Sequence, residues 1–427
     1  MKIKIEKKND AINPFGGINF VIEEIRNSGI IELIDEELGM RAPQAVYSHS
    51  DIILALWCVF FCGGDCAEDI NEHLKDVLEM TPDLKVPNAD TILLVLKQLK
   101  TDKELEYSSA GNAYYININE KLNRLNLSIL KKLKLLDDNQ VYDYDFDNEV
   151  LGTEKYDAKR SYKQKDGYFP GMSTINGIPV YLENRDGNMH VKTGQASLLS
   201  RSFDLLKEFG VRIYRARMDC GSYTKDVIDI VKKNCKYFYI RAMRCGSLED
   251  LMREIDEWEK IEINHKTYEI ASVRYKPFGG EDEYRVVITR EPNKTGQKDL
   301  FTDDAMIYRG ILTDDFKTAD KDIVDFYNQR GAEERVIDVM NNDFGWNRMP
   351  FSFMNENTVF LIVQMICKNV YTHIISTFST KLKFLKKNFR LKRFIFRFIT
   401  VPAKWLSRGR GKVLKLFTQK SYEALVA

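Results

Sequence analysis

Three side chains that could act together on a phosphate group or a metal ion are spaced along residues 325–340. Tyr327, Arg330 and Glu334 stand at positions i, i+3 and i+7, which share one face if the segment is a helix of 3.6 residues per turn. Phe326 would then face a core. An aromatic hydroxyl, a guanidinium and a carboxylate would thus point to one place, and a solvated charged face is the ordinary alternative for such a pattern.

Further carboxylates lie on a strand predicted at residues 141–151. Its first residues alternate between aromatic and acidic side chains, so that Asp143, Asp145 and Asp147 share one face. Strands disfavour Asp, and like charges on one face repel one another. The row therefore costs stability unless cations or solvent compensate the repulsion, and a metal site would explain it.

A second acidic position follows another predicted strand, residues 211–218. Asp219 ends this strand beside a glycine turn, and an amphipathic helix is predicted over 224–233. A carboxylate at the C-terminal edge of such a strand points into the crevice where α/β proteins bind ligands. We therefore expect Asp219 to face the same place as the acidic row.

The order of the predicted elements defines an α/β fold class. After the first strand come two short strands, 171–175 and 179–183, joined by Asn176-Gly177, the strongest short signal for a β-hairpin. The elements that follow are a helix (196–209), the Asp219 strand, the helix at 224–233 and a strand (236–241). This order, β-β-β-α-β-α-β with a later helix that carries Glu334, resembles an RNase H-like nuclease core.

The spacing of the first three side chains resembles the signature of the DDE transposases of bacterial insertion sequences. That group is marked by Tyr, two residues, Arg, three residues, Glu, six residues and Lys. Tyr327, Arg330 and Glu334 fit this spacing, and Asn341 occupies the Lys position. The departure concerns a DNA contact and not a metal ligand. The resemblance extends over about residues 50–370 through blocks at 86–91, 167–170, 183–188 and 218–222.

The resemblance implies a DNA transposase, a polynucleotidyl transferase and endonuclease that cuts and rejoins DNA at the ends of its own mobile element by cut-and-paste transposition. It implies that Asp147, Asp219 and Glu334 hold two Mg²⁺ or Mn²⁺ ions, hard cations that prefer carboxylate oxygens. An inactive or domesticated RNase H-like DNA-binding protein, or a related nuclease, is the alternative.

The first metal ligand has a competing candidate. Asp145 lies two residues before Asp147 on the same face, and it remains an alternative catalytic acid. Asn148-Glu149 replaces the small residue and Thr that usually follow the first acid of the family. We select Asp147 because of its place before this residue pair.

Length and composition allow two or three domains in 427 residues, of which 44% are hydrophobic and 30% charged. The predicted parts are a helical N-terminal domain for DNA end binding or dimerisation (1–137), the first part of the RNase H-like core (138–245), a β-rich insertion (246–318), the last part of the core with Glu334 (319–375) and a basic helical C-terminal segment (376–427). Packing on the core alone is the other role open to the first domain.

The predicted helices of the N-terminal domain lie near 19–27, 29–38, 50–63, 67–79, 90–100 and 120–136. The insertion has a predicted helix at 247–258 and predicted strands at 266–275, 284–290 and 305–312.

Residues 381–420 carry fourteen Lys or Arg side chains and no Asp or Glu, although the net charge of the chain is only +1. Seven interleaved Phe and Trp residues favour an ordered basic surface over a disordered tail. The phosphate backbone of DNA is the natural partner, and a basic amphipathic membrane helix is the alternative. The predicted DNA contacts are Tyr327, Arg330, Asn341, Lys386, Lys387, Arg390 and Arg393.

Other patterns restrict the function and the compartment. Seven scattered cysteines indicate a reducing compartment, and no glycine loop that could cradle phosphates is found, so no nucleotide cofactor is expected. Residues 1–10 lack the apolar stretch of a secretory signal, and the longest apolar runs are too short to span a membrane. We expect a bacterial, cytoplasmic, nucleoid-associated protein that binds double-stranded DNA, both terminal inverted repeats and target, as a homodimer in the synaptic complex.

Overall fold

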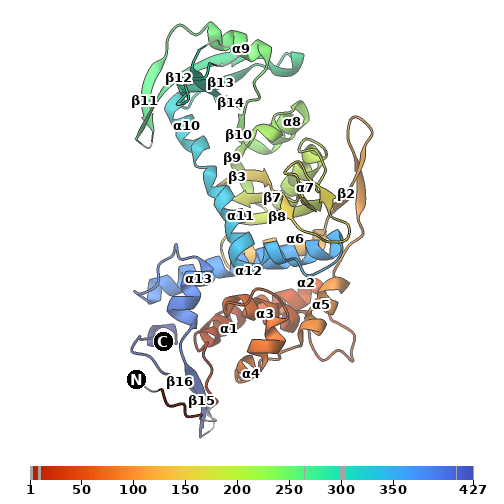
Figure 1. The fold of residues 1–427 in the computed structure, drawn as a ribbon, viewed down its shortest axis with the longest axis vertical. Helices are drawn as coiled ribbons and strands as arrows, with labels where there is room; N and C mark the ends of the chain where they lie inside the picture. The colour runs from red at the N-terminus through yellow and green to blue at the C-terminus, as the bar shows by residue number, and fades with distance from the viewer. Residues whose placement is uncertain (1–2, 8–10, 264, 299–303, 410, 427) are drawn as a thin grey trace.

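The computed structural model describes residues 3–7, 11–263, 265–298, 304–409 and 411–426, without the side chains of 332–334. An eleven-stranded mixed sheet runs through it (Figure 1). Its strands are β1 (Glu104–Tyr107), β2 (Ala113–Asn117), β3 (Val141–Asn148), β7 (Gly171–Ile175), β8 (Ile178–Arg185), β9 (Arg212–Met218), β10 (Cys235–Arg241), β11 (Glu259–Ile263), β12 (Lys266–Tyr275), β13 (Tyr284–Pro292) and β14 (Met306–Thr313). The spatial order is β1-β2-β8-β7-β3-β9-β10-β14-β13-β12-β11. Strands β3, β9 and β10 are mutually parallel neighbours, and the other pairs are antiparallel.

The middle of the sheet confirms the predicted order of elements. Strands β3, β7 and β8 are followed by α7 (Gln195–Glu208), β9, α8 (Lys225–Asn234) and β10. Asn176 and Gly177 have φ angles of 49° and 78°, as the turn between two hairpin strands requires. The aromatic side chains of β3, among them Tyr144 and Phe146, are buried with apolar residues of α7 and α8. This burial fixes the face on which the aspartates of β3 must lie.

The β-rich insertion continues the central sheet and does not form a separate one. It contains α9 (Gly246–Arg253) and strands β11 to β14, which occupy the upper end of the molecule in Figure 1. Strand β14 pairs with β10, so the last strand of the insertion returns the chain to the middle of the sheet. The three predicted strands of the insertion are confirmed as β12, β13 and β14.

The N-terminal region is mainly helical, as predicted. Its elements are α1 (Ile18–Asn27), α2 (Ile30–Leu38), α3 (His49–Phe61), a π-helical turn (Ile70–Leu74), α4 (Lys75–Leu78), α5 (Ala89–Gln98) and α6 (Glu120–Lys132). The hairpin of β1 and β2 between α5 and α6 was not predicted. Its strands have only four and five residues, and β2 is held by pairing with the distant strand β8.

Helix α12 (Met354–Lys381) joins the N-terminal helices to the sheet, and it runs across the molecule between them (Figure 1). By length and composition this helix could cross a membrane, but 89% of its apolar window is buried inside the protein, which is typical of a core helix. Asn369 donates hydrogen bonds to Asn126 of α6 at 2.9 Å and to the Pro179 carbonyl at 2.7 Å. These buried bonds fix the rotation of α12 against the sheet.

The segment expected to form one helix over residues 325–340 forms two. Helix α10 (Asp320–Asn328) ends before Gln329, and α11 (Gly331–Asp343) begins after Arg330. The backbone N–H of Arg330 donates to the Tyr327 carbonyl, and the Phe326 carbonyl accepts from the N–H of Gln329 and, at 2.7 Å, from Arg217. A tertiary contact thus lies at the point where the helical hydrogen bonds that the periodicity predicted are broken.

The expected helical C-terminal segment is also corrected. After α12 the described part of the chain forms a short helix, α13 (Leu391–Phe394), a π-helical turn (Ile395–Ile399) and a 3₁₀ turn (Glu423–Leu425). A hairpin of β15 (Ala403–Arg408) and β16 (Gly411–Leu416) follows. Buried aromatic residues such as Phe394 and Phe398 anchor this segment in the core. The amphipathic membrane helix proposed as an alternative would need a longer helix than these turns supply.

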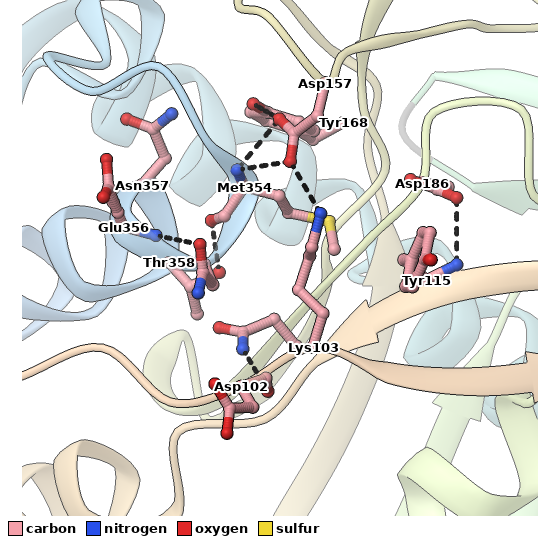
Figure 2. A network of polar contacts seen from close by, with 12 residues as sticks. Asp102, Lys103, Tyr115, Asp157, Tyr168, Asp186, Met354, Glu356, Asn357 and Thr358 are labelled. Atoms are coloured by element: carbon pink, nitrogen blue, oxygen red, sulfur yellow. Dashed lines mark hydrogen bonds and ion pairs between the residues drawn. The ribbon is translucent and has the colours of Figure 1, made fainter.

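A small three-stranded sheet, in the order β4-β6-β5, lies between β3 and β7 in the sequence. Its strands are β4 (Leu151–Gly152), β5 (Lys159–Arg160) and β6 (Asp166–Tyr168). Asp157 ties it to α12 (Figure 2): both carboxylate oxygens accept the backbone N–H of Met354 at 3.0 Å. The Tyr168 hydroxyl donates to the same carboxylate at 2.5 Å, and the Lys103 ammonium lies 3.1 Å away. A carboxylate at a helix N-terminus is favourable both as a hydrogen-bond acceptor and as a charge.

Replacing Asp157 should therefore destabilise the fold. In Asp157→Asn the buried N–H of Met354 loses a charged acceptor and Lys103 loses its partner, and we expect a loss of about 1–3 kcal/mol in the free energy of unfolding. Urea denaturation measures it. Asp166→Asn, at an exposed site of the same small sheet, is the control and should change stability little. Equal effects of the two substitutions would contradict this role of Asp157.

Candidate active site

The acidic row of β3 faces a row of arginines on β9. In the parallel register Asp143 is paired with Arg215 and Asp145 with Arg217. Each guanidinium donates two hydrogen bonds of 2.7 Å to its carboxylate. The first two acids are thus neutralised by the guanidinium cations of arginines, and a metal ion is not needed to compensate their charges.

The third acid of the row has a different neighbour. One step further in the same register, Asp147 comes opposite Asp219, which follows the last residue of β9. Burial raises the pKa of Asp147 to about 6; the positive charge of Arg330 lowers it, and the negative charge of Asp219 raises it. The register thus brings Asp147 and Asp219 side by side where the paired strands end, and the guanidinium that pairs with Asp147 comes from Arg330 and not from β9. Repulsion between the two carboxylates favours a bound cation or a proton there.

Helix α10 covers the guanidinium–carboxylate pairs with an aromatic ring. The centroid of the Phe326 ring lies 3.7 Å from the guanidinium carbon of Arg215 and 4.4 Å from that of Arg217. Such stacking is favourable because the ring face is electron-rich and the guanidinium is planar and weakly hydrated. Asp145 is fully buried beneath it.

Tyr327 anchors the end of α10 to the end of β9. Its hydroxyl is buried and donates a hydrogen bond to the Met218 carbonyl at 3.0 Å, directly before Asp219. The guanidinium of Arg241 lies over the ring, 4.7 Å from its centroid. The structure thus places Tyr327 beside the acidic pair, with its hydroxyl engaged inside the protein.

Arg330 lies over the acidic pair. Its side chain is 12% exposed, and Nη2 is 3.1 Å from Oδ1 of Asp147. The N–H groups of Arg330 do not point at this oxygen in hydrogen-bond geometry. Within the described part of the chain, Nε and Nη2 of Arg330 have no hydrogen-bond acceptor. Buried guanidinium N–H groups without an acceptor are costly, so the site fits an additional anionic group.

A cleft of about 380 Å³ opens between the end of β9 and the junction of α10 and α11. It is lined by Asp219, Cys220, Arg241, Tyr327, Asn328, Arg330 and Gly331. Its lining carries a carboxylate and two guanidiniums, a combination suited to a metal-bound or phosphate-bearing ligand and not to an apolar one.

The third predicted ligand, Glu334, falls within the bounds of α11, but its side chain lies outside the described residues. Among the residues that the structure does describe, no group of three His, Cys, Asp or Glu side chains could hold a metal ion. The donor chemistry of Asp147 and Asp219 nevertheless fits a hard divalent cation, because carboxylate oxygens are the ligands that such ions prefer.

The predicted DNA contacts divide into two groups. Asn341, on α11, has a buried side-chain oxygen without a hydrogen-bond partner among the described residues. Lys386, Arg390 and Arg393 line a surface cavity of about 690 Å³, and Lys387 is exposed nearby in the sequence. Arg390 is held by two acids of α11, Asp338 at 2.7 Å and Asp343 at 3.0 Å. The structure thus brings Tyr327 and Arg330 to the acidic pair and places Lys386, Lys387, Arg390 and Arg393 on the separate C-terminal segment.

The sequence reasoning missed the residues that organise this site. Arg215 and Arg217 alternate along β9 with the same period of two as the aspartates of β3, and this complementary pattern could have predicted the pairing. It also missed Arg185, which is fully buried and donates to the side-chain oxygen of Asn148. Asn148, the residue that departs from the family pattern after Asp147, therefore has a structural partner.

The family model described as transposase DDE domain group 1 matches residues 2–427, so the chain belongs to the DDE transposase family, as its signature predicted. Members of this family generally use divalent metal ions. No curated protein matches the chain.

A solved structure, the Drosophila P element transposase strand transfer complex, is similar with a TM-score of 0.26 and 12% sequence identity. The similarity covers 58% of this chain, and it spans about half, 52%, of the length of that chain.

Asp145 should be more important for stability than its neighbour in the row. In Asp145→Asn the buried guanidinium of Arg217 keeps its charge without a counter-ion, which should cost about 3–5 kcal/mol. The matched control is Asp143→Asn, whose pair with Arg215 is more exposed and should cost less. Urea unfolding of both variants measures the difference, and equal losses would contradict the structural role of Asp145.

The raised pKa of Asp147 predicts a pH dependence of stability. Because the folded pKa of about 6 exceeds the unfolded value of 3.8, the folded state binds the proton more tightly between these values. The stability of the wild type relative to Asp147→Asn should therefore fall as pH rises from about 4 to 6 and level off above, by up to about 3 kcal/mol. Urea unfolding across this pH range, without divalent ions, measures it. A pH-independent difference would show that Asp147 titrates normally.

Proposed function

We propose that this protein is the DNA transposase of a bacterial insertion sequence, which cleaves and rejoins DNA at the ends of its element in a metal-dependent, cut-and-paste reaction. The observation that carries the proposal is the meeting of Asp147 and Asp219 at the ends of β3 and β9, with the buried guanidinium of Arg330 at 3.1 Å. Membership of the DDE transposase family supports the same reaction class.

An RNase H-like core is part of this proposal. The strand order β8-β7-β3-β9-β10, with β3, β9 and β10 parallel and the β7–β8 hairpin antiparallel, supports it. The division into parts that end at residues 137, 245, 318 and 375 belongs to the same proposal. In this scheme the insertion separates the acids of the sheet from Glu334 in the sequence.

Asp147, Asp219 and Glu334 are the proposed ligands of two Mg²⁺ or Mn²⁺ ions. When bound, these ions would activate a water molecule or a 3′-hydroxyl and stabilise the leaving oxygen at phosphorus. Asp147 is preferred to Asp145, because the Asp145 carboxylate is fully buried and both of its oxygens accept from Arg217.

Arg330 is proposed to bind a phosphate of the DNA beside the cut through Nε and Nη2, which have no hydrogen-bond acceptor among the described residues. The hydroxyl of Tyr327 is engaged with the Met218 carbonyl, so we assign this residue to positioning Arg330 as well as to lining the DNA-binding cleft. Asn341 is proposed as a further DNA contact, and it lies on α11, the helix that begins after Arg330.

The C-terminal segment is proposed to add sequence-independent affinity for the DNA backbone through Lys386, Lys387, Arg390 and Arg393. Arg390 already pairs with Asp338 and Asp343, so the lysines and Arg393 would contribute more. A homodimer that holds the terminal inverted repeats and the target DNA, in the cytoplasm and at the nucleoid, completes the proposal.

Cleavage of DNA that carries the inverted repeats flanking the gene tests this function. Asp219→Asn and Glu334→Gln should each lower the cleavage rate on the order of 10³-fold or more, with binding of the repeats retained, because acids that act as one unit give large and non-additive losses. Asp226→Asn, at an exposed acid of α8, is the control and should cleave normally. Normal cleavage by Glu334→Gln would exclude the proposed ligand set, and no cleavage by the wild type would favour an inactive DNA-binding protein.

A further inference from the structure

The segment between the strand of Asp147 and strand β7 forms a separate small surface, here named the platform and defined as residues 151–168. It comprises β4, β5 and β6, and it begins three residues after β3 ends. None of the residues assigned to catalysis or DNA binding above belongs to it. The platform follows Asp147, a proposed metal ligand, closely in the sequence. Its surface could therefore contact the same ligand as the acidic pair.

Close backbone packing makes the platform rigid. A Cβ atom on Gly167 would lie 2.3 Å from the Leu151 carbonyl, and one on Gly187 would lie 2.2 Å from the Gly167 carbonyl. Only glycine fits where two backbones approach so closely. Asp157 fastens the other side of the platform to the N-terminus of α12 (Figure 2).

The platform carries exposed positive charge. Between residues 153 and 166 there are five Lys or Arg and three Asp or Glu, and one of these acids, Asp157, is engaged internally. Lys159, Arg160 and Lys165 are exposed. Within the described ranges of the chain Lys159 and Lys165 form no ion pair, and Arg160 is 3.9 Å from a half-exposed Asp166, a weak pair.

Two tyrosines on the platform are unusually exposed for aromatic residues. Tyr156 is 84% and Tyr162 is 66% exposed. Tyr162 contacts Phe169 edge to face at 5.9 Å, and Tyr156 contacts Phe353 in the same manner at 5.5 Å. These contacts hold the rings in place, while most of their surface remains available to a partner. Exposed aromatic rings between cations are the surface that nucleic acids favour.

Contacts also connect the platform to the acidic pair. The ammonium of Lys163 lies 2.6 Å from a carboxylate oxygen of Glu149, two residues after Asp147. Partial burial alone would lower the pKa of Lys163, but Glu149, Tyr162 and Asp147 raise it above its ordinary value. The platform is therefore close enough to the acidic pair for a charge on one to act on the other.

We propose that the platform is a DNA-binding surface that holds the strand beside the cut, with Lys159, Arg160 and Lys165 on phosphates and Tyr156 and Tyr162 against sugars and bases. This inference rests on the proposed function, because it takes the partner of the acidic pair to be DNA. Charge complementarity commits the surface to a polyanion, and the rigid attachment fixes its position relative to Asp147. Ordering few groups on binding keeps the entropic cost low.

The full-length variant Lys159→Gln/Arg160→Gln/Lys165→Gln tests the proposal. Its affinity for a duplex carrying the flanking inverted repeat should fall at least 10-fold at moderate salt, and the slope of log affinity against log salt should become shallower by up to about 0.9 per lost phosphate contact. Phosphate-ethylation interference should disappear at phosphates next to the cleavage point and persist elsewhere. The control Lys233→Gln/Lys260→Gln/Lys294→Gln removes the same charge from exposed positions outside the platform and should bind like the wild type.

The outcomes separate this proposal from the proposed function. An unchanged salt slope and interference pattern in the platform variant, together with loss of cleavage in Asp219→Asn, would overturn the platform proposal and leave the transposase function in place. Loss of interference only at phosphates remote from the cut would overturn it as well. Absence of any DNA binding by the wild-type chain would overturn both. Tyr156→Ala gives a second test, because loss of ring contact should weaken binding about 5-fold or more without changing the salt slope.

Discussion

The parallel register between β3 and β9 is the constraint on which the candidate site depends. It sets Asp143 against Arg215 and Asp145 against Arg217, so that two acids in the middle of a large sheet are neutralised, the second of them where water is excluded. The same register leaves Asp147 and Asp219 together at the strand ends. A shift of one residue would turn the arginines to the opposite face and leave buried carboxylates unpaired, which is prohibitively costly.

This register also shapes the helical part of the site. Arg217 also donates through Nη1 to the Phe326 carbonyl, two residues before α10 ends and close to where the chain resumes as α11. Phe326 covers the arginines, Tyr327 binds the last carbonyl of β9, and Arg330 reaches Asp147. One guanidinium thus couples the neutrality of the sheet to the placement of the helix that carries Glu334.

Helix α12 holds the other parts of the molecule in position relative to one another. Its apolar surface is shared by the N-terminal helices, the sheet and the aromatic residues of the C-terminal segment. Its N-terminus is capped by Asp157 of the platform, so the surface next to Asp147 is fixed to the central helix of the protein. The acidic pair is thereby surrounded by elements whose relative positions are determined by packing and by paired charges.

The sequence by itself determined the order of helices and strands in the middle of the sheet, most N-terminal helices, the strands of the insertion and the family. These follow from local periodicity, turn residues and motif spacing, which do not require a partner in space. Tertiary structure alone decided that Asp143 and Asp145 pair with arginines of β9 while Asp147 comes opposite Asp219 and pairs with Arg330, that one predicted helix is two, that β1 and β2 extend the sheet, and that residues 403–416 form a hairpin. Each of these depends on a contact between segments distant in the chain, because hydrogen bonds from a remote strand or arginine outweigh the small local preferences of the residues involved.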